Sequence, residues 1–402
     1  MVRRILVLAT AVVLAGCAGA TTDSPADSAS LTPVHSAASP NGRPSSTPDT
    51  LDVAIIRFAD PANPATLTVD TATGRVLERL PDGPVSPDGS TLYALRPIDR
   101  DTEVDALDPL TGVTTRYRTV PGRWALPTMG ADRTPIGLAS DGSVLVLTAL
   151  DAPDGSSRFA VLSASLNADP TYVDLAGSFD VDGISPSGGT LFLVERRDGR
   201  DYAVRSVDVT SGRLDPQPVV DKREGGEAMV GTAIGRIVST PWLHTLYQAQ
   251  QPFLHSLDAT NRFTLCVDLD PVFNRSHELA LALTADGGLG WIVDVSSSRI
   301  AGINVEEGLA GAAKPFGWAE ASPASTVAPA STVGPAAAVR FDPALVLDGA
   351  VLVGMARGLV RVDPAMGLAR LVLSRPVAGL GRSLSGTPVA VFDDGTALAV
   401  PR

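Results

Sequence analysis

A turn phrase that recurs along the chain is the feature that most limits how the chain can fold. Residues 86–93 read Ser-Pro-Asp-Gly-Ser-Thr-Leu-Tyr, residues 185–192 read Ser-Pro-Ser-Gly-Gly-Thr-Leu-Phe, and residues 284–291 read Thr-Ala-Asp-Gly-Gly-Leu-Gly-Trp. Each is a tight turn leading into a strand, because Asp can cap its own turn and Gly supplies positive φ. Self-similarity at a fixed period indicates a stacked or radial repeat architecture.

A second element follows most of these turns. It reads apolar-x-x-apolar-Asp and then a turn closed by Gly or Asn, and it occurs at 104–112, 204–212, 254–261 and 359–367. From residue 51 onward the chain shows short strands broken by Gly, Pro, Asp and Asn, and hardly any helical periodicity, which predicts an all-β fold. Turn, strand, strand, Asp-turn and strand together make one four-stranded propeller blade.

The spacing of the turns predicts the number of blades. Turn positions near 88, 141, 187, 240, 286, 348 and 394 recur at intervals of roughly 50 residues, as blade repeats do. We therefore expect a seven-bladed β-propeller, with six or eight blades as alternatives. The one long interval contains a low-complexity run near 319–338, which we interpret as an inserted loop.

Both ends of the repeat region are incomplete in the sequence. Few residues follow the turn at Asp394 and Gly395, whereas the region opens with an Asp-turn element at 66–74 that has no Asp-Gly turn before it. We expect the N- and C-terminal strands to pair in one blade and close the ring, because such pairing removes open sheet edges.

The N-terminus resembles a bacterial lipoprotein signal. Arg3 and Arg4 precede an apolar stretch of ten residues at 5–14, which is too short to span a membrane. The residues 14–17, Leu-Ala-Gly-Cys, resemble a lipobox, which implies cleavage before Cys17 and acylation, for example by palmitate. Two acyl chains are enough for stable anchoring. The alternative is an ordinary signal peptide with a cysteine there by chance.

Three regions follow from this reading. Residues 1–16 are predicted to be the signal peptide, residues 17–50 a disordered Ala/Ser/Thr/Pro tether that begins with the lipidated Cys17, and residues 51–402 the propeller. We expect the mature protein to be tethered to the extracytoplasmic face of the cell membrane. The formal net charge of −12 argues against a nucleic-acid partner.

The repeat is similar to that of a known group of proteins. The phrase at 86–93, coupled to Leu-Asp-Pro-Leu-Thr-Gly at 107–112, resembles the blades of bacterial extracytoplasmic propellers of the YVTN and WD-repeat-like type. The resemblance covers residues 51–402 and implies a propeller in the cell envelope. It implies no single activity, because such propellers include binding proteins, lactonases, quinoprotein dehydrogenases and assembly factors.

Few side chains in the predicted propeller suggest chemistry of their own. His244, His255 and His277 are not at metal-ligand spacing, and Cys266 lies in a strand-like segment where a small buried residue is expected. The sequence at 180–183, Asp-Val-Asp-Gly, imitates only the start of a calcium loop. We assign no catalytic residue and no metal ligand, and we interpret as structural turn residues Asp88, Gly89, Asp141, Gly142, Asp286, Gly287, Asp394 and Gly395.

Two functions remain open at this stage. The first is a non-catalytic binding or scaffold protein of the cell envelope, without a cofactor, whose ligand is an envelope protein or a small molecule. The alternative is a lactonase-like hydrolase with a divalent metal such as calcium in the central channel. Three or more carboxylates converging on one mouth of the channel would favour the enzyme, and an apolar, Trp-lined or Arg-lined top face would favour binding.

Overall fold

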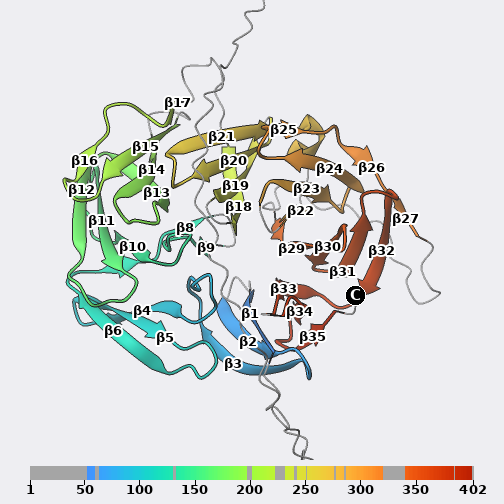
Figure 1. Cartoon of the computed structure of the whole chain (residues 1–402), viewed down its shortest axis with the longest axis horizontal. Coiled ribbons are helices and arrows are strands. Elements are labelled where there is room, and N and C mark those ends of the chain that lie inside the picture. Colours follow the sequence, from blue (N-terminus) through green and yellow to red (C-terminus); the bar gives the residue numbers. More distant parts are fainter. Residues whose placement is uncertain are drawn as a thin grey trace, which may run out of the picture. The chain divides into compact units, whose positions relative to one another are not determined.

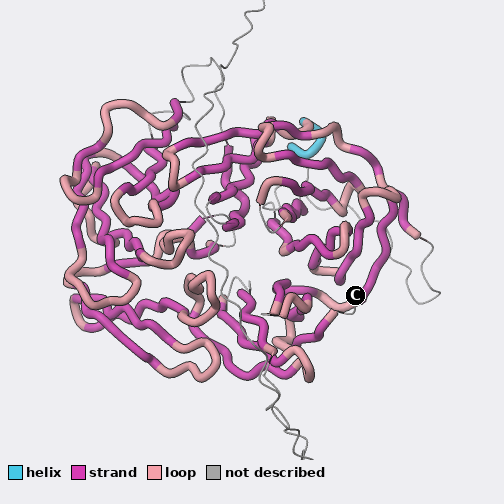
Figure 2. The backbone as a smooth tube through the Cα atoms, viewed as in Figure 1, coloured by secondary structure: helices cyan, strands magenta, loops and turns pink. Residues whose placement is uncertain are grey.

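The computed structural model describes residues 52–58, 63–129, 133–196, 202–221, 231–239, 242–249, 251–275, 278–284, 287–319, 340–383 and 385–400. Residues 51–402 form one compact unit. Within its described part, eight sheets of three to six strands are arranged around a common centre, as Figures 1 and 2 show. The chain is therefore an all-β propeller, as the sequence predicts.

The first four blades follow the chain in order. Blade 1 consists of β1 (Val53–Phe58), β2 (Ala65–Asp70) and β3 (Arg75–Pro81), and blade 2 of β4 (Leu92–Ile98), β5 (Asp101–Leu107) and β6 (Thr114–Val120). Blade 3 consists of β7 (Trp124–Ala125), β10 (Val144–Ala149), β11 (Ser156–Ser163) and β12 (Thr171–Ala176). Blade 4 consists of β13 (Ser178–Ile184), β14 (Thr190–Arg196), β15 (Tyr202–Asp208), β16 (Arg213–Leu214) and β17 (Val220–Asp221).

The remaining blades complete the ring. Blade 5 consists of β18 (Gly231–Ser239), β19 (Trp242–Ala249), β20 (Phe253–Asp258) and β21 (Phe263–Asp268). Blade 6 consists of β22 (Glu278–Leu283), β23 (Leu289–Asp294), β24 (Arg299–Asn304), β25 (Leu309–Ala310), β26 (Lys314–Pro315) and β28 (Arg340–Asp342). Blade 7 consists of β27 (Gly317–Trp318), β29 (Ala344–Leu347), β30 (Ala350–Met355), β31 (Gly358–Asp363) and β32 (Leu368–Leu373), and blade 8 of β33 (Val377–Arg382), β34 (Pro388–Phe392) and β35 (Ala397–Ala399).

Two small elements lie outside the blades. A hairpin of β8 (Thr128–Met129) and β9 (Thr134–Pro135) leaves blade 3, and the 3-10 helix η1 (Pro271–Arg275) follows blade 5. No helix in the described ranges is long and apolar enough to cross a membrane.

The recurring turn phrase forms one face of the ring, which we call the turn face. It is the end of the blades at which β4, β10, β14, β19, β23, β30 and β34 begin. In blade 2, Gly89 donates its backbone N–H to Ser86 O at 2.8 Å and adopts a φ of 70°, while Asp88 Oδ1 accepts the Ser90 N–H at 3.0 Å. Successive turns touch, since a Cβ on Gly142 would lie 2.7 Å from Pro87 Cδ.

The core is divided among the interfaces between neighbouring blades. Blades 3 and 4 share a cluster that includes Phe159 and Leu193, and blades 6 and 7 share one that includes Val293 and Val353. The other six interfaces have their own buried apolar clusters. Each blade therefore depends on both neighbours to cover its two faces.

The predicted number of seven blades is wrong, because the described residues form eight, which the sequence offers only as an alternative. The uncounted blade is blade 1, whose β1–β2 connection reads Ala-Asp-Pro-Ala-Asn-Pro at 59–64 and has no Asp-Gly pair. The turn at Asp394 and Gly395, taken as the start of a blade, instead connects β34 to β35 within blade 8. The turn that precedes β34 is residues 383–387, where Ser383 donates its N–H to Thr387 O at 2.9 Å.

The predicted pairing of N- and C-terminal strands in one blade is not confirmed. Blades 1 and 8 are separate sheets that pack face to face through Ile56, Leu67 and Val391. One isolated bridge joins Ala54 to Ser383. The predicted loop near 319–338, the signal peptide and the tether lie outside the described residues, apart from Ala319.

The seam between blades 8 and 1 can be tested with glycine substitutions. A Cβ on Gly379 of β33 would lie 2.5 Å from Arg57 O and 2.9 Å from Ile56 Cγ2, whereas one on Gly302 of β24 would meet no atom within 4 Å. We expect Gly379→Ala to lower the free energy of unfolding by about 1–3 kcal/mol, measured by denaturant titration, because overpacking forces the two strands apart. Gly302→Ala should leave stability unchanged or slightly higher. Equal stability of the two variants would contradict the packing of blade 8 on blade 1.

Candidate functional site

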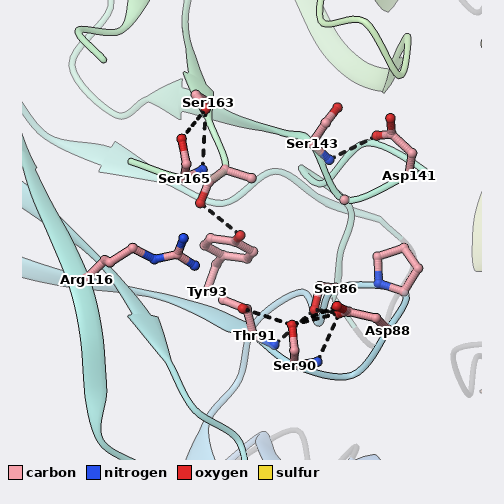
Figure 3. A pocket seen from close by; sticks show the side chains of 13 residues that line it. Ser86, Asp88, Ser90, Thr91, Tyr93, Arg116, Asp141, Ser143, Ser163 and Ser165 are labelled. Atoms are coloured by element: carbon pink, nitrogen blue, oxygen red, sulfur yellow. Dashed lines mark hydrogen bonds between the residues drawn. The ribbon is translucent and has the colours of Figure 1, made fainter. Parts of the chain in front are cut away.

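A cavity of about 420 Å³ opens on the turn face between blades 2 and 3. Its walls are three turns: 86–91 before β4, 141–143 before β10, and 163–165 after β11. Ten of its lining residues are polar, and Figure 3 labels them: Ser86, Asp88, Ser90, Thr91, Tyr93, Arg116, Asp141, Ser143, Ser163 and Ser165. Pro87, Gly142 and Ala164 complete the lining.

Hydrogen bonds within the turns fix the walls. Asp88 Oδ1 accepts from Ser86 Oγ at 2.6 Å and from Ser90 Oγ at 2.9 Å. Asp141 Oδ1 accepts the Ser143 N–H at 2.9 Å. The two carboxylates that cap equivalent turns in neighbouring blades thus stand on the same side of the cavity, as Figure 3 shows.

Tyr93 lies between the two blades at the side of the cavity away from these carboxylates. Its hydroxyl donates to Ala164 O at 2.9 Å, and burial raises the pKa of the phenol. Arg116 of β6 is exposed and points its guanidinium toward Tyr93 in Figure 3. Hydrogen bonds from Ser86 and Ser90 hold the pKa of Asp88 below its ordinary value, so this carboxylate is ionised at neutral pH.

The residues singled out from the sequence fall in different places. Asp88, Asp141 and Gly142 line the cavity, and Gly89 belongs to the same turn as Asp88. Gly287 has a φ of 72° before β23, and Asp394 and Gly395 form the β34–β35 turn, remote from the cavity. Asp286, His277 and Cys17 lie outside the described residues. Arg116, Ser163 and Ser165 have no signal in the sequence, because only the packing of two blades brings them to the cavity. Tyr93 is visible in the sequence only as the last residue of the phrase at 86–93.

A second, smaller cavity of about 190 Å³ lies at the ring centre. It is lined by two arginines, one threonine and apolar or glycine residues from β1, β9, β18, β22, β29 and β33: Arg57, Thr134, Arg236, Ile237, Leu281, Pro343, Ala344, Ala378, Gly379 and Leu380. Arg57 forms a bidentate ion pair with Asp82 at 2.9 Å.

A buried ionic cluster joins blades 4 and 5. Asp182 of β13 pairs through Oδ1 with Arg236 of β18 at 2.6 Å and through Oδ2 with His255 Nε2 of β20 at 3.1 Å. All three side chains are at most 2% exposed. The register of β13 shifts between Val181 and Gly183, so Asp182 sits in a bulge that directs it toward blade 5. The sequence at 180–183 is therefore part of an inter-blade contact.

The two described histidines differ in their protonation. Burial would lower the pKa of His255, but the Asp182 carboxylate outweighs it and raises the value to about 9. Burial lowers the pKa of His244 to about 4, and its Nδ1 lies 2.9 Å from Ser256 Oγ. Asp182 has a pKa of about 2, because the charges of His255 and Arg236 overcome the cost of burial. His255 is thus a cation and His244 is neutral at neutral pH.

Cys266 is half-buried, which is more exposed than the sequence predicts, and its Sγ lies 3.7 Å from His255 Nδ1. Cys266, His255 and Asp182 thus form a chain of contacts like that of a cysteine nucleophile with a histidine base held by an aspartate. However, Cys266 lines neither of the two cavities above. Within the described part of the chain, no group of three or more His, Cys, Asp or Glu side chains is placed to hold a metal ion.

Comparison with known proteins identifies no family for this chain. No family model matches the sequence, and no curated protein does. The resemblance to YVTN-type propellers therefore stays a prediction.

Several solved structures are similar in fold. BamB from Moraxella catarrhalis is 12% identical, with 86% of this chain and 94% of that chain covered and a TM-score of 0.44. AztD from Citrobacter koseri is 10% identical, with 83% and 98% covered and a TM-score of 0.41. An oligogalacturonate lyase in complex with manganese is 12% identical, with 64% and 73% covered and a TM-score of 0.39. No function of this chain follows from the likeness.

The ionic cluster predicts a specific pH dependence of stability. The pKa of His255 rises from 6.5 in the unfolded chain to about 9 in the folded one. Protonated His255 therefore contributes about 3 kcal/mol to the free energy of unfolding by linkage. This contribution is complete below pH 6.5 and is lost as the pH rises through 9. We expect His255→Gln to flatten the decline of the free energy of unfolding between these pH values.

His244→Gln is the matched control for this measurement. The pKa of His244 is lowered from 6.5 to about 4, so its effect on stability lies on the acid side. The alkaline decline should therefore persist in His244→Gln. An alkaline slope that His255→Gln leaves unchanged would contradict the assignment of the charged pair.

Proposed function

We propose that this protein is a membrane-tethered, extracytoplasmic propeller that acts as a non-catalytic binding or scaffold protein in the cell envelope. The turn face is the surface that engages a protein partner. The anchor is a lipid on Cys17, and the propeller holds its partner close to the membrane without spanning it.

The distribution of exposed apolar side chains carries this proposal. In the described residues, twelve large hydrophobic side chains are exposed, and nine of them lie at the turn face by the register of their strands: Leu110, Val113, Val238, Phe263, Leu289, Leu309, Trp318, Met366 and Leu368. The other three are Tyr117, Leu150 and Leu398. Exposed apolar residues that gather on one surface mark an interaction site.

Seven of the nine lie in blades 5 to 7, which are neighbours in the ring. Phe263 at the start of β21 is 51% exposed, Leu309 of β25 is 59% exposed, and Met366 between β31 and β32 is 69% exposed. Aromatic and methionine side chains are enriched in the buried centres of protein interfaces. A partner that covers blades 5 to 7 would bury these side chains together.

The start of the described propeller also lies at this face. Asp52 accepts from Ser385 N at 3.1 Å and from Ser385 Oγ at 2.7 Å, and Ser385 belongs to the turn before β34. The proposed tether, residues 17–50, precedes Asp52 in the chain. A tether of this length reaches on the order of 30 Å if it is a flexible coil.

The partner surface can be tested by capture from the native cell envelope. The triple variant Phe263→Ser, Leu309→Ser and Met366→Ser should capture at least tenfold less partner, measured by quantitative mass spectrometry after crosslinking. Such anchors contribute more than about 1 kcal/mol each to the free energy of binding. The control is Tyr117→Ser, Leu150→Ser and Leu398→Ser, which removes the three exposed apolar side chains elsewhere. The same captured proteins in equal amounts from both variants would refute the turn face as the docking surface.

The anchor is tested separately. Cys17→Ala should move the protein from the membrane fraction to the soluble fraction, because the two acyl chains that hold it are lost. Intact mass spectrometry of the wild-type protein should show a mature chain that begins at Cys17 and carries acyl chains. A mature protein of unmodified mass would disprove the lipobox assignment.

A further inference from the structure

The cavity between blades 2 and 3 has a chemistry that defines a class of ligand. At about 420 Å³ it falls within the size range of small-molecule sites. It is separate from the proposed partner surface on blades 5 to 7, and nothing in the comparisons assigns it a role.

The hydrogen bonds within the cavity walls determine which donors and acceptors remain available to a ligand. Most of its hydroxyl protons are already donated inside the protein, from Ser86 and Ser90 to Asp88, from Ser165 to Asn167 Oδ1, and from Tyr93 to Ala164 O. Each of these hydroxyls keeps an oxygen lone pair that can still accept. The walls therefore present acceptors, and a ligand has to supply donors.

The charged groups sharpen this requirement. Asp88 and Asp141 supply two carboxylates on one side of the cavity, and in the described residues Asp141 Oδ2 accepts no hydrogen bond. The Arg116 side chain makes no hydrogen bond or ion pair with any described residue, and it lies on the opposite side of the cavity, as Figure 3 shows. The formal charge of the lining is −1, so a cationic ligand suits it better than an anionic one.

We infer that this cavity binds an amino sugar, with the ammonium group at the carboxylates of Asp88 and Asp141 and a sugar oxygen at the guanidinium of Arg116. A sugar ring bears several hydroxyls that donate to the serine oxygens while each also accepts. The ammonium adds donors where the two carboxylates stand. A uronic acid would place its carboxylate in a cavity of the same sign, and glucose would leave the charge of the carboxylates unmatched.

The test is direct binding of three probes to the purified full-length chain. Glucosamine, glucose and glucuronate are titrated in turn by ligand-observed NMR, at a pH where the amine is protonated. We expect glucosamine to bind about tenfold tighter than glucose, as a charge-assisted hydrogen bond implies, and glucuronate to bind most weakly.

Three variants separate the site from the rest of the surface. Asp141→Asn keeps the oxygen that caps the Ser143 N–H, so the turn stays intact while the charge is lost, and the preference for glucosamine over glucose should fall about tenfold. Arg116→Ala should weaken the binding of glucosamine and the binding of glucose by a similar factor. Asp348→Asn, at an exposed aspartate in the turn before β30, should bind all three probes like wild type.

Several results would overturn the inference. They are no saturable binding of any probe to the wild-type chain, glucuronate binding more tightly than glucosamine, or an effect of Asp348→Asn equal to that of Asp141→Asn. Phe263, Leu309 and Met366, which test partner capture, do not line this cavity, so the outcome of that test is distinguishable from that of the sugar site.

Discussion

The packing of each blade against its two neighbours is the constraint on which this structure depends. No three-stranded sheet such as β4–β6 covers both of its own faces, so Val104 and Leu145 are buried only because blades 2 and 3 meet. The same contact also builds the polar cavity, since the turns that cap the two blades are brought together when their apolar faces pack. Stability and binding geometry therefore come from one interaction, repeated around the ring.

The sequence predicts the fold class well because the turn chemistry is local. Gly89 and Gly142 have φ values of 70° and 77°, which explains why Asp-Gly pairs recur before strands. The number of blades is predicted poorly because it is counted from Asp-Gly pairs, and some blades have turns without this pair. Blade 1 begins without one, and the turn before β34 uses Ser383 and Gly386 in its place. Whether the terminal strands share a sheet depends on pairing between distant segments, which no local pattern reveals.

Candidate site residues are predictable to a smaller extent. Asp88 and Asp141 are visible in the sequence as turn residues, but their position on one side of a cavity arises only from the packing of two blades. Arg236 carries no motif, and Asp182 stands in a sequence that only imitates the start of a calcium loop. Polar residues in a strand give no sign of a partner 54 positions away. The bulges at 181–183 in β13 and 233–235 in β18 bring them together, and bulges have no simple sequence signal.

The bond between Asp52 and Ser385 has a consequence for the order of folding. The two residues are 333 positions apart, so this contact closes nearly the whole domain. Blades 2 to 7 are formed by segments close in sequence and can assemble as the chain emerges, whereas blade 1 keeps one apolar face uncovered until blade 8 exists. Until blade 8 has been made, β1 and its neighbours expose an aggregation-prone surface, and we expect chaperone dependence to be concentrated in this first blade.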